Sequence, residues 1–425
     1  MSVDTQTPSP APAADPGFSG DQRATTVGGA VREYADKIRG GDMGALPAVL
    51  GLIVLLIVFS AIQPDTFPSP RNIANLTVQA GAICVLAMGL VPVLLLGDID
   101  LSAGVSGGTA SAVTALALAN HGQSWPVAVV VGVLTGAVIG LLIGIMVAKV
   151  GIPAFVVTLA FFLGLQGVNL KLIGSGASIP VRNETILNIS NSNMNVVLGW
   201  VVAIVAIVLY GLLALRKHQV QVKRGLQHGP LALVLARIVG LALLVVAFTA
   251  ILSVDRAPAV GVVLAGVPWV VPLVVVLLIV LTFIFSKTSY GRHVYAVGGN
   301  KEAGRRAGIN VDAIRVSVFA IASSMAAISG IITASRLNGV SPDAGAGNTL
   351  LYAVGAAVIG GTSLFGGRGK VRDAVIGGFV IATIDNGLGL LGQEAYVKFI
   401  VTGVVLLIAA SVDALSRRRR TVTGT

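Results

Sequence analysis

The stretch VPWVVPLVVVLLIVLTFIF, from Val267 to Phe285, decides the fold class. It carries no charged residue, and a helix needs about 20 mostly apolar residues to cross the hydrocarbon core of a membrane. The whole chain has this character, because 55% of its 425 residues are hydrophobic and only 11% are charged, with a mean hydropathy of +0.90. A soluble protein would carry about a quarter charged residues. We therefore expect an all-α polytopic membrane protein.

Twelve apolar stretches are candidate transmembrane helices. They are residues 45–63, 76–97, 101–120, 126–148, 153–173, 196–215, 231–254, 259–286, 313–335, 349–366, 373–391 and 396–413. The segments at 76–120 and 349–366 are rich in glycine, so we expect broken or partly re-entrant helices there. The sequence thus predicts about 10–12 transmembrane helices, some of them broken.

Lysine and arginine predict the orientation, because loops on the cytoplasmic side carry most of them. With a cytoplasmic N-terminus, the inside segments hold 22 of the 29 basic residues. The outside segments hold Arg71, Lys171, Arg182, Arg256, Arg336 and Lys398. We expect a multi-pass protein of the cell membrane with both termini in the cytoplasm. Membrane orientation accounts for the net charge of +11, so we expect no nucleic-acid partner.

The two ends of the chain differ in composition from the middle. Residues 1–44 are rich in Pro, Ala, Asp, Gly and Thr, and they cannot bury enough apolar surface to fold. We expect a disordered cytoplasmic tail there, a membrane domain at 45–415, and a basic cytoplasmic tail at 416–425.

Within the fourth apolar stretch, GVLTGAVIGLLIG places Gly132, Gly136, Gly140 and Gly144 at four-residue spacing. Small residues at this spacing form a flat groove along one side of a helix and allow a second helix to approach closely. We read this stripe as a structural packing surface without a direct role in transport.

Polar side chains inside the apolar stretches are candidates for a translocation pathway, because such residues are costly in a membrane. They are Asp98, Asp100, Ser102, Gln166, Asn169, Asp385 and Asn386. Amides, carboxylates and hydroxyls suit a neutral sugar with many hydroxyl groups. Two alternatives stay open: each can serve as an interhelical hydrogen bond, and Asp98 and Asp100 can cap a helix that starts near 102, with Asp100 as its N-cap.

A polar basic segment, YAVGGNKEAGRRAGINV, follows the eighth apolar stretch at Tyr295–Val311. Lys301–Gly308 is predicted to be a short helix, with Asn300 as N-cap and Glu302 near its positive end. Arg305 and Arg306 fall in its last turn and Gly308 ends it. Such a helix between two spans is either a contact for a partner or an ordinary positive loop. The polar loop 175–193 on the outside is similarly either a docking site for a capture protein or a solvated connector.

The sequence also indicates where the energy for transport comes from. The stretch GGTSLFGGRGKV at 360–371 is not a phosphate-binding loop, because Leu364 replaces the first required glycine and Val371 the Ser or Thr after the lysine. Energy therefore comes from a separate ATPase or from an ion gradient. An intramembrane enzyme is disfavoured, because the four histidines are predicted to lie in loops.

A family resemblance favours the separate ATPase. GRHVYAVGGNKEAGRRAGINV at 291–311 resembles the coupling segment of permease subunits of bacterial ABC importers of the ribose/xylose/galactose group. Glu302, Ala303 and Gly308 match the pattern Glu-Ala-Ala-x3-Gly, with Gly304 in place of the second alanine. GDIDLSAG at 97–104 is similar to the signature Gly-Gly-Ile-Asp-Leu-Ser-Val-Gly of the same group. The resemblance covers roughly residues 47–413.

The resemblance implies an ABC importer permease fold and import of a monosaccharide. The extra basic loop RKHQVQVKRGLQHGP at 216–230 and the span near 231–254 look most like the xylose-type members. D-xylose is therefore the expected sugar, with ribose or galactose as alternatives and a gradient-driven secondary transporter as the rival class. The residues expected to couple to the ATPase are Asn300, Glu302, Ala303, Arg305, Arg306 and Gly308.

The resemblance also implies the partners. They are cytoplasmic ATPase subunits that hold ATP and Mg²⁺, an extracytoplasmic sugar-binding protein, and a second permease subunit that forms a homodimer within the membrane lipid. The chain itself is expected to catalyse no reaction and to bind neither cofactor nor metal.

Overall fold

The computed structural model describes residues 44–226, 228–257 and 263–423, together with Thr26, Gly28, Gly29, Arg32, Ala35 and Asp36. Most of the predicted N-terminal tail at 1–44 therefore lies outside the described residues. Contacts divide the chain into two compact units. The smaller unit contains Ile204–Val245 with Met1–Arg39, and the larger unit contains Gly40–Ala203 and Val246–Thr425.

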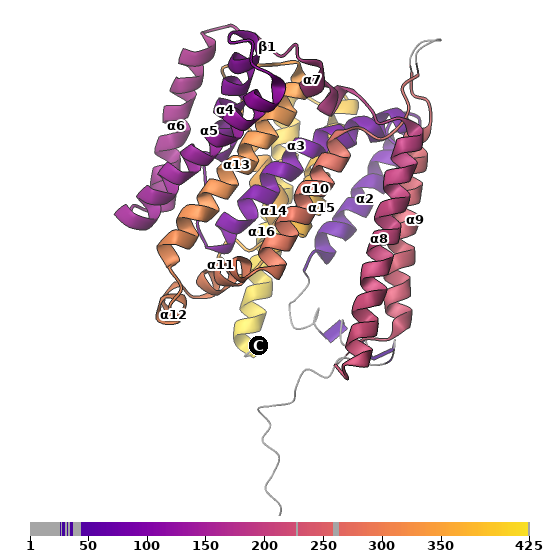
Figure 1. Cartoon of the computed structure of the whole chain (residues 1–425). Helices are drawn as coiled ribbons and strands as arrows, with labels where there is room; N and C mark the ends of the chain where they lie inside the picture. The colour runs from indigo at the N-terminus through magenta and orange to yellow at the C-terminus, as the bar shows by residue number, and fades with distance from the viewer. Residues whose placement is uncertain are drawn as a thin grey trace, which may run out of the picture. The chain divides into compact units, whose positions relative to one another are not determined.

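The described chain is almost entirely helical (Figure 1). In the larger unit the elements before residue 196 are α2 (Leu46–Ile62), α3 (Pro70–Leu95), α4 (Ala103–Ala119), α5 (Trp125–Ile145), η1 (Met146–Val150), α6 (Ala154–Ile173), β1 (Ile179–Pro180) and α7 (Glu184–Asn191). Those after residue 269 are α10 (Val270–Lys287), α11 (Ser289–Gly299), α12 (Lys301–Arg306), α13 (Val311–Leu337), β2 (Gly339–Val340), α14 (Thr349–Ile359), α15 (Val371–Leu390) and α16 (Ala395–Thr423). The smaller unit holds most of α8 (Val196–Lys223) and the first part of α9 (Leu231–Ser253).

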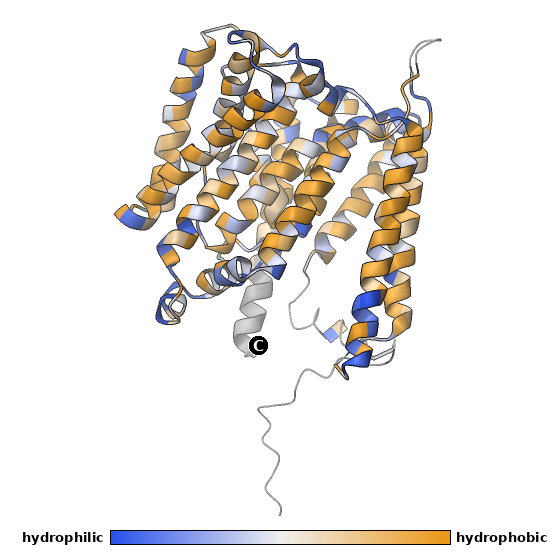
Figure 2. Ribbon diagram, viewed as in Figure 1, coloured by the Kyte–Doolittle hydropathy of each residue, from blue (hydrophilic) through white to orange (hydrophobic). Residues whose placement is uncertain are grey.

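Each of the twelve predicted stretches contains a helix, which confirms the all-α polytopic fold. Among the described residues, 8 helices are long and apolar enough to cross a membrane. Four shorter apolar helices, α2, α4, α14 and the first part of α16, account for the remaining stretches. Apolar side chains of α5, α6 and α10, such as Leu134, Leu163 and Ile279, are more than half exposed. The ribbons of these helices are coloured mostly as hydrophobic (Figure 2).

Three predicted boundaries are wrong. Helix α3 begins at Pro70 rather than near 76, because the Ser69 hydroxyl accepts the N–H of Asn72 and proline fits the first helical position. Helix α10 begins only at Val270, since residues 263–269 form a loop in which Pro268 pairs with Asn193. Helix α14 ends at Ile359, where a glycine-rich loop begins.

The ends of two predicted segments also differ from expectation. The polar loop 175–193 contains the short helix α7, which Asn183 caps by accepting the N–H of Ile186 at 3.3 Å. Helix α16 continues to Thr423, beyond the position 416 at which we expected a C-terminal tail to start.

In the smaller unit, α8 and α9 form a helical hairpin. Gly211 of α8 lies opposite Ile238 of α9, so that a Cβ at Gly211 would be in ordinary contact with the isoleucine side chain, at 3.6 Å. Beyond the apolar part of the hairpin, the rings of His218 and His228 meet edge to face, 5.3 Å apart. Helix α8 continues to Lys223, so the first half of the predicted basic loop 216–230 is helical, and the turn of the hairpin begins only after it.

Helix α13 lies at the centre of the larger unit and packs against α3, α4 and α5. The glycine stripe of α5 makes this possible. A Cβ at Gly136 would collide with the carbonyl oxygen of Ser323, one at Gly140 with that of Phe319, and one at Gly144 would lie 2.7 Å from a backbone atom of α13. The predicted packing surface is therefore confirmed, with α13 as its main partner.

Two helices begin in the middle of the larger unit instead of at its ends. Gly107 in the second turn of α4 packs on the backbone of Ala326, near the midpoint of α13. One turn earlier, Gly104 packs against the backbone of Gly345 and lies close to the first turn of α14, which starts at Thr349. The N-terminal ends of α4 and α14 thus meet at mid-depth, as in transporters built from discontinuous helices. This arrangement confirms the expected break in the helices.

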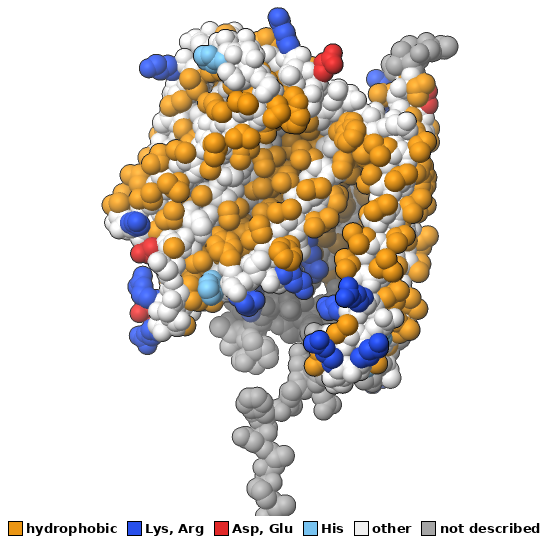
Figure 3. Space-filling view, in the orientation of Figure 1, with side chains coloured by type: hydrophobic (Ala, Val, Ile, Leu, Met, Phe, Trp, Pro, Cys, Tyr) orange, Lys and Arg blue, Asp and Glu red, His pale blue; other side chains and the backbone are white. Residues whose placement is uncertain are grey.

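The larger unit has two opposite ends, which we name the α12 face and the α7 face. Helix α13 begins beside α12 and ends beside α7, where β2 follows it and pairs with β1 (Figure 1). In the space-filling view an apolar band lies between these ends, and charged side chains gather at its borders (Figure 3).

Candidate functional site

Helix α12 has the capped geometry that the sequence predicts. The Asn300 side chain accepts the N–H of Ala303 at 2.9 Å, and Gly308 ends the segment with a left-handed φ of 81°. Glu302 lies 3.4 Å from Arg305 and 3.8 Å from Arg306, and all three side chains are at least 60% exposed. The helix therefore presents a charged surface of both signs.

Helix α11, which we did not predict, fixes α12 to the rest of the α12 face. Its N-cap Thr288 accepts the N–H of Gly291 at 3.3 Å. Near its end, the Tyr295 hydroxyl donates to the carbonyl of Gly369 at 2.7 Å, and burial raises the pKa of this tyrosine. Gly298 packs on the carbonyl of Leu95, the last residue of α3. Helix α11 is thus held against α3 and against the loop that precedes α15.

Asp98 lies at the α12 face and forms the main ion-pair cluster there. Arg315 of α13 donates to both of its carboxylate oxygens, at 2.9 and 3.0 Å. The ammonium group of Lys301, the first residue of α12, lies 3.6 Å away. Arg315 also donates to the carbonyl of Val147 in η1 at 3.2 Å. One carboxylate therefore connects the segment after α3 with α12 and α13, and through Arg315 with η1.

Asp100 faces the start of α4. Its Oδ1 accepts the backbone N–H of Ser102 at 2.9 Å and the Ser102 hydroxyl at 2.6 Å. The N-cap position is occupied by Ser102 and not by Asp100. The predicted N-cap is therefore wrong by two residues, although the Asp100 carboxylate does accept a backbone N–H just before the helix. The Oδ2 of Asp100 has no hydrogen-bond partner among the described residues.

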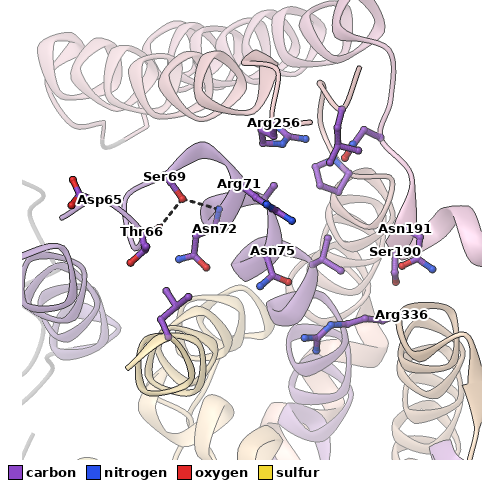
Figure 4. Close-up of a pocket in the computed structure, with 16 residues that line it drawn as sticks. Asp65, Thr66, Ser69, Arg71, Asn72, Asn75, Ser190, Asn191, Arg256 and Arg336 are labelled. Atoms are coloured by element: carbon purple, nitrogen blue, oxygen red, sulfur yellow. Dashed lines mark hydrogen bonds between the residues drawn. The ribbon is translucent and has the colours of Figure 1, made fainter. Parts of the chain in front are cut away.

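A polar pocket of about 650 Å³ opens at the α7 face (Figure 4). This volume is typical of small-molecule sites. Its lining comes from the connection between α2 and α3 and the first turns of α3, the end of α7 and the segment before α10, with single residues at the ends of α13 and α15. The lining residues are Asp65, Thr66, Ser69, Arg71, Asn72, Ala74, Asn75, Val78, Ser190, Asn191, Asn193, Arg256, Leu264, Pro268, Arg336 and Leu390.

The pocket wall is fixed by hydrogen bonds to the backbone. Arg256 is 6% exposed, and its guanidinium donates to the carbonyls of Leu252 and Gly266. Elsewhere in the lining, the Asn191 amide donates to the carbonyl of Ser335 at 2.8 Å. The pocket therefore has preset walls, and most of its polar groups are amides, hydroxyls and guanidinium groups that suit an oxygen-rich ligand.

Asn386, one of the predicted pathway residues, lies beside this pocket. Its side-chain amide exchanges two hydrogen bonds with that of Asn72, at 2.9 and 3.0 Å. Both residues are buried, and Asn72 also donates to the carbonyl of Phe67 at 2.9 Å. Asp385, the preceding residue, is more exposed and pairs with Lys398 of α16 at 3.8 Å.

The other predicted pathway residues do not join the pocket. Asn169 is fully buried in α6, and neither polar atom of its side chain has a hydrogen-bond partner in the described part of the chain. Gln166 lies half-buried one turn earlier. The structure therefore places the predicted residues at three locations: Asp98, Asp100 and Ser102 follow α3, Gln166 and Asn169 lie on α6, and Asp385 and Asn386 lie near the α7 face.

Sequence reasoning missed several residues that the structure brings to these sites. Arg315 was counted only as a positive charge, and Lys301 was a positive charge at the start of the predicted short helix. Because both residues lie far from Asp98 along the chain, the sequence gives no sign that they contact it. For Asn72 a signal was available, because the sequence Ser69-Pro70 announces a helix start and thereby places Asn72 in its first turn.

Comparisons with known proteins agree over most of the chain. The model of the family described as branched-chain amino acid transport system / permease component matches residues 72–410. The xylose transport system permease protein of Escherichia coli (strain K12) is 33% identical over 371 residues, which cover 87% of this chain and 92% of that protein. The corresponding xylose permease of Haemophilus influenzae is 32% identical over 386 residues, 90% of this chain and 99% of that protein.

A ribose permease is also similar. The ribose import permease protein of Escherichia coli (strain K12) is 28% identical over 370 residues, 86% of this chain and 92% of that protein. No solved structure matches the chain.

Proposed function

The chain belongs to the family of branched-chain amino acid transport system permease components, and we propose that it is the membrane permease subunit of an ATP-driven importer for a monosaccharide, D-xylose. The observation that carries this proposal is the full-length similarity to the xylose permeases, which extends over at least 92% of their own length. The ribose permease aligns over a comparable length at lower identity, so ribose and galactose are the competing sugars.

Helix α12 with its two capping ends is the proposed contact for the cytoplasmic ATPase subunits. Helix α12 is short and capped at both ends, and it is attached through α11 to α3 and the loop before α15. Force applied to its exposed charged residues would therefore reach the membrane helices. The basic residues of the α12 face, among them Lys287, Arg292 and Lys370, support a cytoplasmic position for this face.

The α7 face then lies outside the cell, and its pocket is the proposed entrance for the sugar. The exposed Asn75 offers a side-chain amide that can donate to and accept from sugar hydroxyls, and Asn191, whose Nδ2 already donates to two partners, offers its amide oxygen. An extracytoplasmic sugar-binding protein would deliver the sugar at this face. A second copy of the chain would complete the importer in the membrane.

Reconstitution tests this proposal directly. The purified chain is placed in proteoliposomes with its ATPase subunits and sugar-binding protein, and uptake of radiolabelled D-xylose, D-ribose and D-galactose is measured. We expect ATP-dependent accumulation of xylose that resists an uncoupler. Accumulation by the chain alone, or accumulation that collapses with the uncoupler while ATP is held constant, would contradict an ATP-driven mechanism. Preference for ribose or galactose would change only the sugar.

Charge reversal tests the ATPase contact separately. The double variant Arg305→Glu/Arg306→Glu should abolish co-purification of the ATPase subunits and sugar uptake together, because both side chains are exposed and available to a partner. The matched control is Lys171→Glu/Arg182→Glu, which reverses two exposed charges on the α7 face. It should leave co-purification unchanged. If the α12 variant keeps both ATPase and uptake, the assignment of α12 is wrong.

A further inference from the structure

The segment between α3 and α4 connects the α12 face to the middle of the larger unit. Gly97, with a left-handed φ of 71°, turns the chain out of α3. Six residues later α4 begins, and its Gly104 already packs on Gly345, four residues before the start of α14. Any displacement of residues 97–102 therefore moves the N-terminal end of α4 against α14.

Asp98 is the second residue of this segment, and two contacts of unequal strength hold its carboxylate. The contact with Arg315 is bidentate at 2.9 and 3.0 Å, and the arginine side chain is only 17% exposed. Bidentate guanidinium–carboxylate pairs are among the strong hydrogen bonds of proteins. The contact with Lys301 is a single one at 3.6 Å, and the lysine side chain is 45% exposed. An ion pair of this kind is weak and is easily released.

We propose that Asp98 is a positioning residue that transmits movement of α12 to the α4–α14 junction, with Arg315 as its fixed contact and Lys301 as its releasable one. This inference rests on the proposed function, because it assumes an ATPase that moves α12. Lys301 is the first residue of α12, so a tilt of that helix changes the distance from its ammonium group to Asp98 directly. Asp98 then passes the change to residues 97–102, while Arg315 keeps it attached to α13 and η1.

Two features of the surroundings favour transmission at this point. Arg315 also holds the carbonyl of Val147 in η1, a single π-helical turn, and such turns are frequent at functional sites. Moreover, the loop before α15 bonds to the same end of α3, since the N–H of Gly367 donates to the carbonyl of Leu95 at 2.8 Å. The neighbouring segments are thus tightly attached, and the lysine contact is the weakest of these connections.

The test uses variants of Lys301 and not of Asp98, because removal of the carboxylate would leave the half-buried Arg315 unpaired and could prevent folding. Lys301→Ala removes the releasable contact, and Lys301→Arg keeps its charge. Lys287→Ala is the matched control, because it removes another exposed lysine from the α12 face. Each variant is assembled with the ATPase subunits and sugar-binding protein in proteoliposomes, and sugar imported per ATP hydrolysed is measured.

We expect Lys301→Ala to retain bound, active ATPase while the sugar imported per ATP falls at least about fivefold, the lower end of ordinary coupling between two sites. Lys301→Arg and Lys287→Ala should keep the wild-type ratio. Hydrogen–deuterium exchange gives a second measurement: ATP binding should change deuterium uptake of residues 97–108 in the wild type and in Lys287→Ala, but not in Lys301→Ala.

An unchanged ratio in Lys301→Ala, or a loss that only follows loss of bound ATPase, would overturn the role of Asp98 while leaving the importer assignment intact. A wild-type chain that neither binds the ATPase nor imports sugar would overturn both.

Discussion

Asn72 and Asn386 bind each other through two reciprocal amide hydrogen bonds, although 314 residues separate them in the chain. The pair joins the first turn of α3 to the fifth turn of α15 beside the polar pocket. Because both side chains are buried, neither can exchange its partner for bulk water.

We predict that Asn386→Ala destabilises the protein, because it leaves the buried amide of Asn72 without its partner. An unsatisfied buried polar group costs about 1–3 kcal/mol. The double variant Asn72→Ala/Asn386→Ala should be less destabilised than the sum of the single variants. Thermal unfolding in detergent measures this, with the exposed Asn75→Ala as control. Strict additivity of the two changes would contradict a mutual pair.

Helix packing gives a second prediction, for which α5 and α6 offer matched glycines. Gly140→Ala should lower the unfolding temperature and the yield from membranes, because the new methyl group collides with the carbonyl of Phe319 in α13. Overpacking of this kind costs about 1–3 kcal/mol. Gly164→Ala in α6 meets no atom within 4 Å of its Cβ and should be neutral or slightly stabilising. Equal effects at the two positions would show that the glycine stripe of α5 does not determine how closely α13 packs against this helix.

The N-cap of α12 yields a third prediction. Asn300→Ala removes the acceptor for the N–H of Ala303, which costs about 1 kcal/mol at an N-cap. We expect weaker binding of the ATPase subunits and little change in overall unfolding, because α12 is exposed. Asn300→Ser should restore binding, since serine is also a good cap. The affinity is measured by titrating the ATPase onto the immobilised chain, and wild-type affinity in Asn300→Ala would contradict a role for the cap.

The pocket wall yields a fourth prediction. Arg256 donates to two carbonyls from one guanidinium plane, and the single ammonium of Arg256→Lys cannot reproduce this fork geometry. Both Arg256→Lys and Arg256→Ala should therefore lower the unfolding temperature and reduce uptake. Arg71→Lys, at an exposed lining residue of the same pocket, should change stability little. An Arg256→Lys variant with wild-type stability would show that the fork is not required.

The fold could be predicted largely from composition and from the length of the apolar runs. In lipid, the backbone N–H and C=O groups of a single span can find hydrogen-bond partners only within the span, which therefore forms a helix. The boundaries of α10 and α14 failed because apolar or glycine residues continue past the helix, whereas the start of α3 failed because its first turns are polar. Residues 263–269 and 360–366 are apolar or glycine-rich, so hydropathy alone does not separate them from α10 and α14. Helix α11 escaped prediction because it is short and amphipathic and lies outside the apolar runs.

The candidate sites were only partly predictable. Helix α12 has strong local signals in Asn300, Glu302 and Gly308, so the sequence predicted its cap and its end. Asp98, in contrast, was predicted as a pathway residue because acidic side chains are rare in apolar stretches. Its neighbours Lys301 and Arg315 lie more than 200 residues away, and only the folded chain brings them together. The pocket likewise combines separate segments whose individual signals are weak.

The backbone contact between α4 and the segment before α14 has a consequence for how the middle of the larger unit is closed. Helix α14 has 11 residues, which span about 16 Å at 1.5 Å per residue, well short of the roughly 30 Å hydrocarbon core. The remaining depth is crossed by non-helical chain whose residues Ala344 and Gly345 press directly on Gly108 and Gly104. A side chain at Gly104 or Gly108 would collide with a backbone oxygen and force these two segments apart, so the close packing at this level depends on the absence of side chains there.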